Sequence, residues 1–403
     1  MRKILSLLIH INLVVWASSV YAQCNATYEM STGELSLPQV HVYSESTQVG
    51  DYKVEMKNEG DPQNMCFKVK NVDLIDSSSI ESDFLVKRIR EKGSLLCGGR
   101  DDLLGFGYSC REKGHCGFDI DLCRAVSAAV LNSLTGPIIF IPVSTDERSK
   151  SLKDATVDIL SRNTTWTSSR EADWGHFTWI MFYDGQGFMV RTDSNITVIA
   201  ELNGKRICVT SATTTFKNLE DEFAKRNLTW TPVLAEETSE AMSLYQRGEC
   251  DAVTTDRSGL AAGKARFDDS ENHRILGITI SKEPLTPVIP AGDEQFLDIV
   301  KIVMFGLINA EELGITQNNV EEMITSSENP KIKLLLGVEG DFGQERLGLA
   351  KEALAQTIRA VGNYGEIYER HFGPNGVVNI PRDINQLWDK GDERGLIYAP
   401  PIR

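Results

Sequence analysis

The stretch VDILSRNTTWTSSR, residues 157–170, decides the fold, because it joins a strand-like run to a hydroxyl-rich loop that ends in an arginine. A second stretch, CDAVTTDRSG at residues 250–259, repeats the same order of strand and polar loop. Loops that follow parallel strands gather at the carboxyl edge of a sheet, which is where ligands bind in open α/β folds. The two stretches therefore predict two similar units, each with a binding loop.

The surrounding sequence alternates between strand and helix patterns. A first series passes from an apolar strand that ends residues 89–99 to a helical pattern at 117–131 and a buried strand at 136–143. A second series repeats this layout between residues 184 and 267. Such alternation predicts an α/β fold with mainly parallel strands. Two α/β lobes that face one another are expected to hold a ligand in the cleft between them.

The same patterns suggest the boundaries of the lobes. We expect lobe 1 to be discontinuous, with residues 79–187 joined by residues 290–403, which add a helical C-terminal extension. Residues 188–289 would form lobe 2. The chain would cross between the lobes near residues 187–191 and 282–287.

The N-terminal part has a different character. Residues 1–22 have a basic start, an apolar middle and a small-residue end, which is typical of a secretory signal peptide. Residues 23–78 alternate polar and apolar side chains, which predicts a β-rich appendage and a linker. No later apolar run is long enough to span a bilayer. We expect a secreted protein, periplasmic if bacterial and extracellular if eukaryotic.

The composition excludes several classes of partner. The formal charge is −15 and no cluster of lysines and arginines stands out, so neither nucleic acid nor an anionic membrane is an expected partner. The six histidines are scattered and no C-x-x-C motif occurs, so neither a metal site nor a cofactor is expected. We expect a monomer without catalytic residues.

Eight cysteines in a secreted chain predict disulfides. Local grouping favours Cys110–Cys116 and Cys24–Cys66, which leaves Cys97–Cys123 and Cys208–Cys250. Eight cysteines allow many connectivities, so the residues alone leave the pairing open.

The two polar loops carry chemistry that suits both ends of an amino acid. The planar guanidinium of Arg170 matches a carboxylate. A helix that begins near Thr214 would aim its free N–H groups at the same anion. Asp256, at the end of the strand opposite, suits an ammonium group. Together these groups describe a site for an α-amino acid.

Each of these residues also has a simpler interpretation. Arg170 could form a surface salt bridge, and Asp256 could cap the helix that follows it. Asn163 begins an N-glycosylation sequon, as do Asn25, Asn195 and Asn227. A glycan on Asn163 would place its loop in solvent rather than in a cleft.

Seven stretches resemble the family 3 solute-binding proteins of polar amino-acid transport, and within them the general L-amino-acid binding proteins of ABC transporters. They are CGFDIDLCRAVSAAV, VDILSRNTTWTSSR, FYDGQGFMVR, CDAVTTDRSGLAA, ISKEPLTPV, AEELGIT and VGNYGEIYERHFGP. The resemblance covers residues 79–403. It implies a two-lobed periplasmic-binding-protein type II fold (Venus flytrap) that captures an L-amino acid and delivers it to an ABC permease complex.

The resemblance also implies roles for single residues. Arg170 would bind the ligand α-carboxylate with the help of Thr165, and Thr213 and Thr214 would add hydroxyl and amide donors from lobe 2. The Asn163 carbonyl, together with Thr165, would accept from the α-ammonium group, for which Asp256 would be the counter-ion. The pairs Cys97–Cys123 and Cys208–Cys250 match cysteines typical of the subgroup, one pair in each lobe.

The chain departs from the family pattern at several places. Ala212 stands where a glycine is usual, which restricts the backbone angles of the lobe 2 loop. Arg100, Asp101 and Asp102 replace smaller or uncharged residues beside the side-chain pocket, so they bear on ligand specificity. The appendage and the pairs Cys24–Cys66 and Cys110–Cys116 are also unusual.

Two other functions are compatible with such a fold. One is a dehydratase, for which His176 would be the nearest candidate for a general acid. The other is a secreted protein that keeps the fold for a structural or sensing role outside the cell. The appendage, the extra cysteines and the four sequons favour that second alternative.

Overall fold

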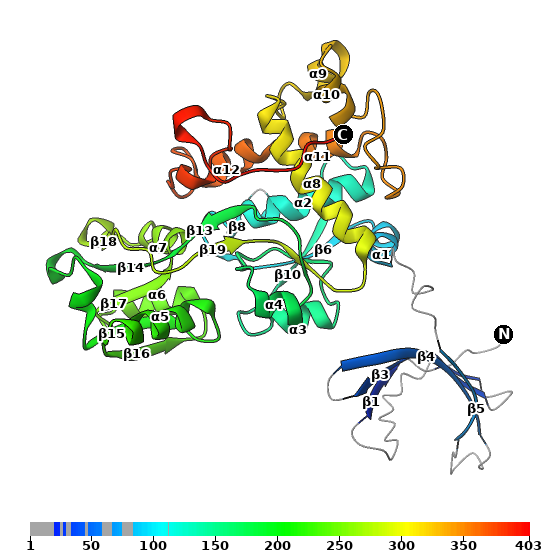
Figure 1. Ribbon diagram of the computed structural model, residues 1–403, viewed down its shortest axis with the longest axis horizontal. Coiled ribbons are helices and arrows are strands. Elements are labelled where there is room, and N and C mark those ends of the chain that lie inside the picture. Colours follow the sequence, from blue (N-terminus) through cyan, green and yellow to red (C-terminus); the bar gives the residue numbers. More distant parts are fainter. Residues whose placement is uncertain are drawn as a thin grey trace. The chain divides into compact units, whose positions relative to one another are not determined.

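The computed structural model describes residues 84–111 and 113–403 in full, and five strands within residues 20–74 (Figure 1). The chain divides into two compact units, Met1–Ser82 and Asp83–Arg403. No helix within the described ranges has the length and apolar character that a membrane crossing needs.

The first unit is an antiparallel sheet with the strand order β1-β3-β4-β5, in which β2 pairs with β3. The strands are β1 (Val20–Cys24), β2 (Thr27–Glu29), β3 (Glu34–Ser44), β4 (Thr47–Asn58) and β5 (Phe67–Leu74). β1 begins inside the predicted signal peptide, so cleavage after residue 22 would shorten it. The predicted Cys24–Cys66 pair and the sequon at Asn25 lie outside the described residues.

Lobe 1 is built on a five-stranded sheet with the order β10-β6-β11-β20-β12. β10 (Ile138–Pro142), β6 (Leu95–Gly99) and β11 (Ile159–Leu160) are parallel, whereas β20 (Val288–Ile289) and β12 (His176–Phe177) pair antiparallel. All five residues of β6 are buried, which explains its unbroken apolar and glycine sequence.

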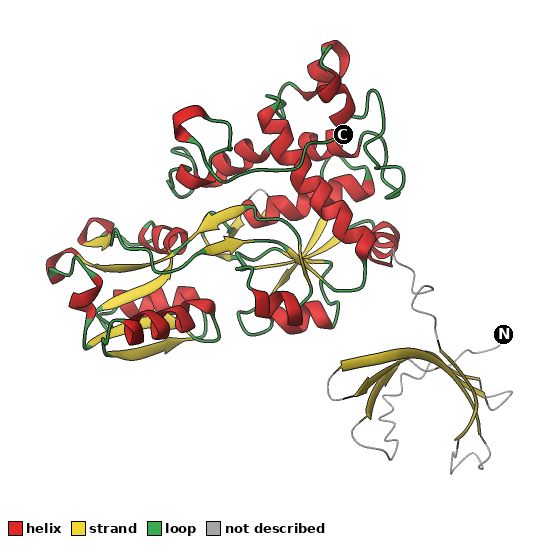
Figure 2. Ribbon diagram, viewed as in Figure 1, coloured by secondary structure: helices red, strands yellow, loops and turns green. Residues whose placement is uncertain are grey.

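Helices cover both faces of this sheet (Figure 2). On one face, α2 (Phe118–Leu131) packs with α8 (Glu294–Glu312), α11 (Ala353–Val361) and α12 (Tyr364–Phe372) in the largest core cluster. On the other face, Leu152 of α3 (Arg148–Lys153) joins a smaller cluster with Val157 and Leu160. The remaining helices of this lobe are α1 (Phe84–Lys92), α4 (Ser168–Asp173), α9 (Val320–Ser326) and α10 (Pro330–Leu335).

Helix α2 confirms the helical pattern at 117–131, and it is buried on all sides rather than on one face. Every residue from Phe118 to Val130 is buried, Asp119, Asp121 and Arg124 included. The C-terminal helices, distant in sequence, enclose the polar side of α2, so buried charges there need partners.

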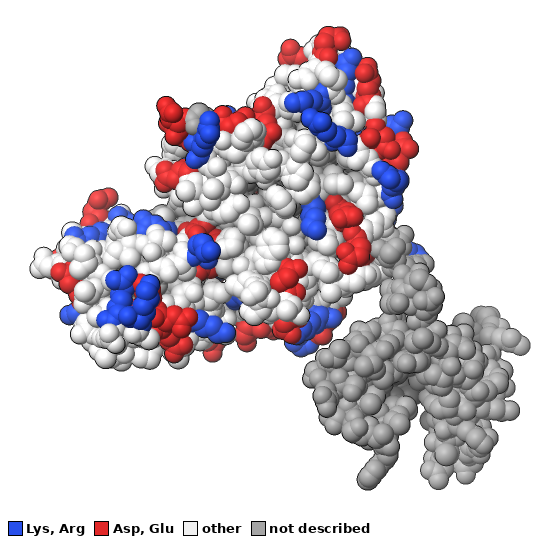
Figure 3. Space-filling view, viewed as in Figure 1, with Lys and Arg blue, Asp and Glu red and all other residues white. Residues whose placement is uncertain are grey.

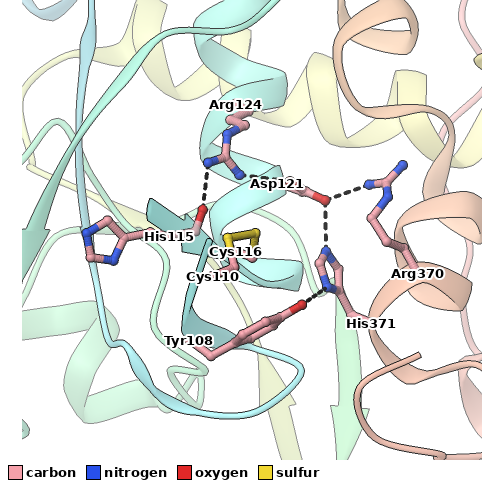
Figure 4. The surroundings of a disulfide bond; sticks show 8 residues. All are labelled: Tyr108, Cys110, His115, Cys116, Asp121, Arg124, Arg370 and His371. Carbon is pink, nitrogen blue, oxygen red and sulfur yellow. Dashed lines mark hydrogen bonds and ion pairs between the residues drawn. A yellow bond between two sulfur atoms is a disulfide. The ribbon is translucent and has the colours of Figure 1, made fainter. Parts of the chain in front are cut away.

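Those partners surround the Cys110–Cys116 disulfide, which closes the hairpin of β8 (Gly107–Cys110) and β9 (Gly114–Cys116) (Figure 4). Asp121 accepts from Arg370 Nη1 at 2.6 Å, contacts His371 Nε2 at 2.8 Å and pairs with Arg124 at 3.1 Å. Although burial alone would raise the pKa of Asp121, contacts with His371, Arg370 and Arg124 hold that pKa well below its usual value. This ionised carboxylate ties α2 to α12.

Lobe 2 repeats the architecture on a sheet with the order β16-β15-β17-β14-β18. β16 (Trp230–Ala235), β15 (Lys205–Thr210) and β17 (Ala252–Asp256) are parallel; β14 (Gln186–Arg191) pairs antiparallel with β17 and with β18 (His273–Ile275). Alternate residues of β14 and β15 face opposite cores, one completed by α5 (Thr214–Lys225) and the other by α6 (Thr238–Gln246). α7 (Arg257–Lys264) follows β17 directly.

Two short antiparallel strands, β13 (Phe182–Asp184) and β19 (Glu283–Leu285), connect the lobes (Figure 1). The second crossing agrees with the expected residues 282–287. The expected first crossing at 187–191 is wrong, because β14 already belongs to the sheet of lobe 2 from Gln186 on. Likewise β20, at 288–289, belongs to lobe 1, so both lobe boundaries shift by a few residues.

Three of the four predicted disulfides are present. Cys97–Cys123 joins β6 to α2, Cys110–Cys116 closes its hairpin, and Cys208–Cys250 joins β15 to the residues just before β17. The face shown in Figure 3 carries acidic and basic side chains intermixed, without a continuous basic patch.

Candidate functional site

A pocket between the two lobes brings together all six residues predicted to contact a ligand. Its lining is hydroxyl-rich and cationic: Arg100, Thr145, Arg148, Arg162, Asn163, Thr165, Arg170, Thr210, Thr213, Thr214, Thr215, Thr238, Thr255 and Asp256. The lining residues up to Arg170 belong to lobe 1 and the others to lobe 2. The strand order causes this convergence, since both lobes present the loops after β11, β15 and β17 to the same cleft.

Arg170 is held in this pocket by its own helix. Thr167 caps α4 and accepts from the Arg170 amide at 3.2 Å. Arg170 Nη1 donates to the Thr165 carbonyl oxygen at 2.9 Å, and the guanidinium carbon lies 4.6 Å from the centre of the Trp174 ring. Within the described residues no carboxylate forms an ion pair with Arg170, which is 7% exposed. The surface salt bridge offered as an alternative is therefore wrong for this side chain.

Asp256 is the matching anion on lobe 2. It occupies the N-cap position of α7, yet its side chain accepts no capping hydrogen bond, so the helix-cap alternative is also wrong. The residue is 7% exposed. Burial raises the pKa of Asp256 well above its usual value, and the neighbouring carboxylates of Asp184 and Glu283 raise it further, whereas Arg170 lowers it. A cation bound beside the Asp256 carboxylate would stabilise its charged form and so lower its pKa again.

The turn at Asn163 forms part of the pocket lining. Asn163 has a φ of 36°, in the left-handed region that asparagine tolerates better than most residues. Its amide donates to Asp119 Oδ2 at 2.7 Å, and its side-chain oxygen accepts from Arg100 Nη1 at 3.4 Å. Asn163 is thus fixed from both sides at the pocket wall, while the sequon residues Asn195 and Asn227 are exposed.

The lobe 2 loop before α5 has the form of an anion-binding helix start. Thr213 caps the helix, since its hydroxyl accepts from the Phe216 amide at 3.2 Å and donates to the Thr210 carbonyl at 2.7 Å. Thr214 and Thr215, the first residues of α5, line the pocket, and amides at a helix start have no partner within the helix. Ala212 adopts a φ of 53°, so this chain keeps the left-handed turn without the glycine that favours it.

Glu283 on β19 accepts hydrogen bonds from two threonine hydroxyls of the pocket and from one side-chain amide beside it. It accepts from Thr165 Oγ1 at 2.6 Å in lobe 1, and from Thr214 Oγ1 at 3.3 Å and Asn218 Nδ2 at 2.8 Å in lobe 2. The hydroxyls of Thr165 and Thr214, which we expected to face a ligand, thus both donate hydrogen bonds to Glu283 in this structure. The stretch ISKEPLTPV contains Glu283, but nothing local marks it as a bridge between lobes.

A second bridge crosses the cleft at Glu237, in the loop before α6. Its Oε2 accepts from Arg162 Nη2 and from Thr145 Oγ1, each at 2.8 Å, and its Oε1 accepts from the Thr145 amide at 2.6 Å. Arg100, in the loop singled out for specificity, pairs with Asp102 at 2.6 Å. Sequence reasoning missed Thr145, Arg148, Arg162 and Glu237, which lack a motif of their own.

The candidate general acid lies elsewhere. His176 Nε2 is 3.2 Å from Glu294 Oε1, and His176 is not among the residues that line the pocket. The described residues contain no cluster of three or more histidine, cysteine or carboxylate side chains that could hold a metal ion.

Most of the chain is similar in sequence to known solute-binding proteins. Residues 95–374 match the family model of bacterial extracellular solute-binding proteins, family 3. The general L-amino acid-binding periplasmic protein AapJ of Rhizobium johnstonii is 44% identical over 329 residues, which cover 81% of this chain and 95% of that protein. The glutamate/glutamine/aspartate/asparagine-binding protein BztA of Rhodobacter capsulatus is 40% identical over 316 residues, or 78% and 92% of the two chains.

A solved structure is also similar. It is an ABC transporter periplasmic binding protein from Brucella ovis with glutathione bound, 42% identical, with a TM-score of 0.74 over 79% of this chain and 99% of that one. The predicted fold class, a two-lobed type II binding protein, is confirmed.

Proposed function

The chain belongs to the bacterial extracellular solute-binding proteins of family 3, and from this premise we propose that it captures an L-amino acid in the cleft between its lobes. The observation that carries the proposal is a pair of buried, opposite charges, Arg170 on lobe 1 and Asp256 on lobe 2. Within the described residues neither has an ion-pair partner. An uncompensated buried charge costs several kcal/mol, so a zwitterion that contacts both would bind strongly.

In this proposal Arg170 and the first amides of α5 receive the α-carboxylate. Asp256 and the Asn163 carbonyl receive the α-ammonium group. Thr165 and Thr213 shape the site through their backbone, because their hydroxyls already donate within the protein. Closure about β13 and β19 removes water from both charges, which strengthens each contact.

The setting follows from the relatives. Those named above are periplasmic proteins, and the Brucella protein is described as part of an ABC transporter. We therefore place this chain in the periplasm, as a monomer that presents the closed, loaded form to a permease. The glutathione of the Brucella structure has an α-amino acid end, so a γ-glutamyl peptide falls within the proposed ligand class.

The test is calorimetry on the purified protein after a thermal-shift screen of the twenty amino acids. We expect at least one to bind with a Kd of about 1 μM or lower, equivalent to about −8 kcal/mol. Arg170→Gln should weaken that binding by a factor of about 100 or more, because the carboxylate loses its buried partner. Arg206→Gln, which removes an exposed arginine paired with Asp251, is the matched control and should bind normally.

If no amino acid or γ-glutamyl peptide bound, the proposal would fail. Unchanged affinity in Arg170→Gln would disprove the assignment of the carboxylate site.

A further inference from the structure

Arg148 is a second buried cation in the pocket without a carboxylate partner. It is the first residue of α3 and is 5% exposed. Its Nε donates to the Thr145 carbonyl oxygen at 2.8 Å, and among the described residues it forms no ion pair. Two further arginines line the pocket, but each has a carboxylate partner: Arg100 pairs with Asp102, and Arg162 pairs with Glu237.

The surroundings of Arg148 oppose its charge. Burial lowers the pKa of Arg148 well below its usual value, and the charges of Arg170, Arg162 and Arg100 lower it further, while Glu237 acts in the other direction. An arginine keeps its proton nonetheless, so the cost falls on the stability of the ligand-free protein. A bound anion would remove this cost.

Arg148 and Arg170 both belong to lobe 1, line the same pocket and pack against the same tryptophan. The guanidinium carbon of Arg148 lies 5.3 Å from the centre of the Trp174 ring, and that of Arg170 lies 4.6 Å from the same centre. Both cations therefore contact the Trp174 ring. On lobe 2, Thr210 lines the same pocket, is 3% exposed, and its hydroxyl has no hydrogen-bond partner in the described part of the chain.

We propose that Arg148 binds a second carboxylate of the ligand, so that the preferred ligands are L-amino acids carrying two carboxylates. This inference rests on the proposed function, in which Arg170 already holds the α-carboxylate. The second carboxylate can belong to an acidic side chain or to the C-terminus of a γ-glutamyl peptide. Thr210 would donate to it, or to a polar group beside it, from lobe 2.

The experiment compares each acid with a neutral counterpart of the same shape. Calorimetry on the full mature protein would use L-glutamate against L-glutamine, L-aspartate against L-asparagine, and glutathione against its glycyl monoethyl ester. We expect the acid to bind at least about tenfold more tightly in one or more pairs, as a charge-assisted contact predicts. The pair that shows the preference identifies the source of the second carboxylate.

Variants then assign the preference to Arg148. Arg148→Gln should reduce the acid-to-neutral ratio to about threefold or less while the neutral ligand keeps its affinity within about threefold. Arg148→Lys, which retains the charge but loses the planar fork, should keep part of the ratio. Arg206→Gln should leave the ratio unchanged.

Two results would overturn the inference. One is a wild-type ratio below about threefold in all three pairs, which needs no variant and therefore holds even if the Arg148 variants do not fold. The other is an equal loss for acid and neutral ligands in Arg148→Gln, which would mean that Arg148 binds the α-carboxylate. Tight binding of neutral amino acids in either case would leave the proposed function standing, whereas no binding of any ligand would remove the proposed function itself.

Discussion

At the scale of single residues, three aspartates in and beside the pocket are buried in surroundings that disfavour their charged form. Burial raises the pKa of Asp256 well above its usual value, and it raises those of Asp119 and Asp184 to about 6. Asp119 and Asp184 hold the Asn163 turn and the start of α7 through accepted hydrogen bonds. Within the described part of the chain the Asp256 side chain accepts no capping hydrogen bond, which supports its proposed role toward the ligand.

These shifts predict how stability depends on pH. The folded protein binds the protons of these aspartates more tightly than the unfolded chain, in which aspartate has a pKa of about 3.9. Stability of the ligand-free protein should therefore be greatest near pH 4 and should fall as pH rises through about 6. Thermal unfolding between pH 4 and pH 8 measures this decline. Paired carboxylates elsewhere, Asp121 among them, act in the opposite direction below pH 4.

The variant Asp256→Asn tests separately how Asp256 affects stability and how it affects ligand binding. The variant should unfold at a higher temperature at pH 7, by about 1–3 kcal/mol of stability, because it removes a buried, unpaired charge. Its affinity for amino acids should fall at least about tenfold, because the ammonium group loses its counter-ion. A variant that gains no stability, or that binds as the wild type does, would show that Asp256 is satisfied in another way.

At the scale of elements, Cys208–Cys250 joins the two strands whose ends carry the lobe 2 contacts. β15 leads to the Thr213 loop and β17 ends at Asp256. The bond closes a sequence separation of 42, against 6 for Cys110–Cys116. Relative position of the two loops thus depends on this bond, whereas Cys110–Cys116 belongs to a hairpin that contributes nothing to the pocket lining.

Removal of each bond by paired Cys→Ala changes should distinguish these roles. We expect a loss of about 4 kcal/mol for Cys208–Cys250 and about 2 kcal/mol for Cys110–Cys116, as loop closure predicts. Only the first change should also weaken amino-acid binding, because it removes the covalent link that reinforces the pairing of β15 with β17. Urea unfolding and calorimetry measure the two effects, and equal losses of affinity in both variants would contradict the assignment.

At the scale of the whole molecule, Glu237 and Glu283 form hydrogen bonds that join one lobe to the other. Glu237 contacts Arg162 and Thr145 across the cleft, and Glu283 contacts Thr165 in lobe 1 as well as Thr214 in lobe 2. Contacts of this kind set the fraction of closed protein, and the apparent affinity for every ligand scales with that fraction.

Glu237→Gln should therefore weaken all ligands together. We expect a loss of about three- to tenfold, the same for acids and neutral amino acids, because the side chain is partly exposed and its ion pair is screened. Small-angle X-ray scattering of the ligand-free variant should show a larger radius of gyration. Glu249→Gln, which removes an exposed partner of Arg247 within lobe 2, is the matched control. A selective loss for acids would instead place Glu237 in the ligand site.

The resemblance to the family 3 solute-binding proteins implied the pairs Cys97–Cys123 and Cys208–Cys250 and the six residues that line one pocket, whereas the sequence by itself determined the α/β class of the fold. It could do so because strand, loop and helix follow each other along the chain, and parallel strands carry their loops to one edge. This order put Arg170 and Asp256 on loops expected to face each other, but the family resemblance was needed to favour ligand binding over a surface salt bridge and a helix cap. We misplaced the first crossing at 187–191 because these residues form a buried strand of the lobe 2 sheet. From sequence alone, such a strand cannot be distinguished from a buried strand that connects the lobes.

Only the tertiary structure decided which charges have partners. Arg148, Arg162 and Arg100 reach the pocket from different elements, and Glu237 and Glu283 meet lobe 1 only when the lobes are together. Whether an arginine is paired depends on groups far away in sequence, such as Arg162 with Glu237. The burial of every residue in α2 up to Val130 has the same origin, since helices from the C-terminal part of the chain cover it. Ion pairing and burial depend on contacts between distant parts of the packed molecule, so a local sequence pattern cannot predict them.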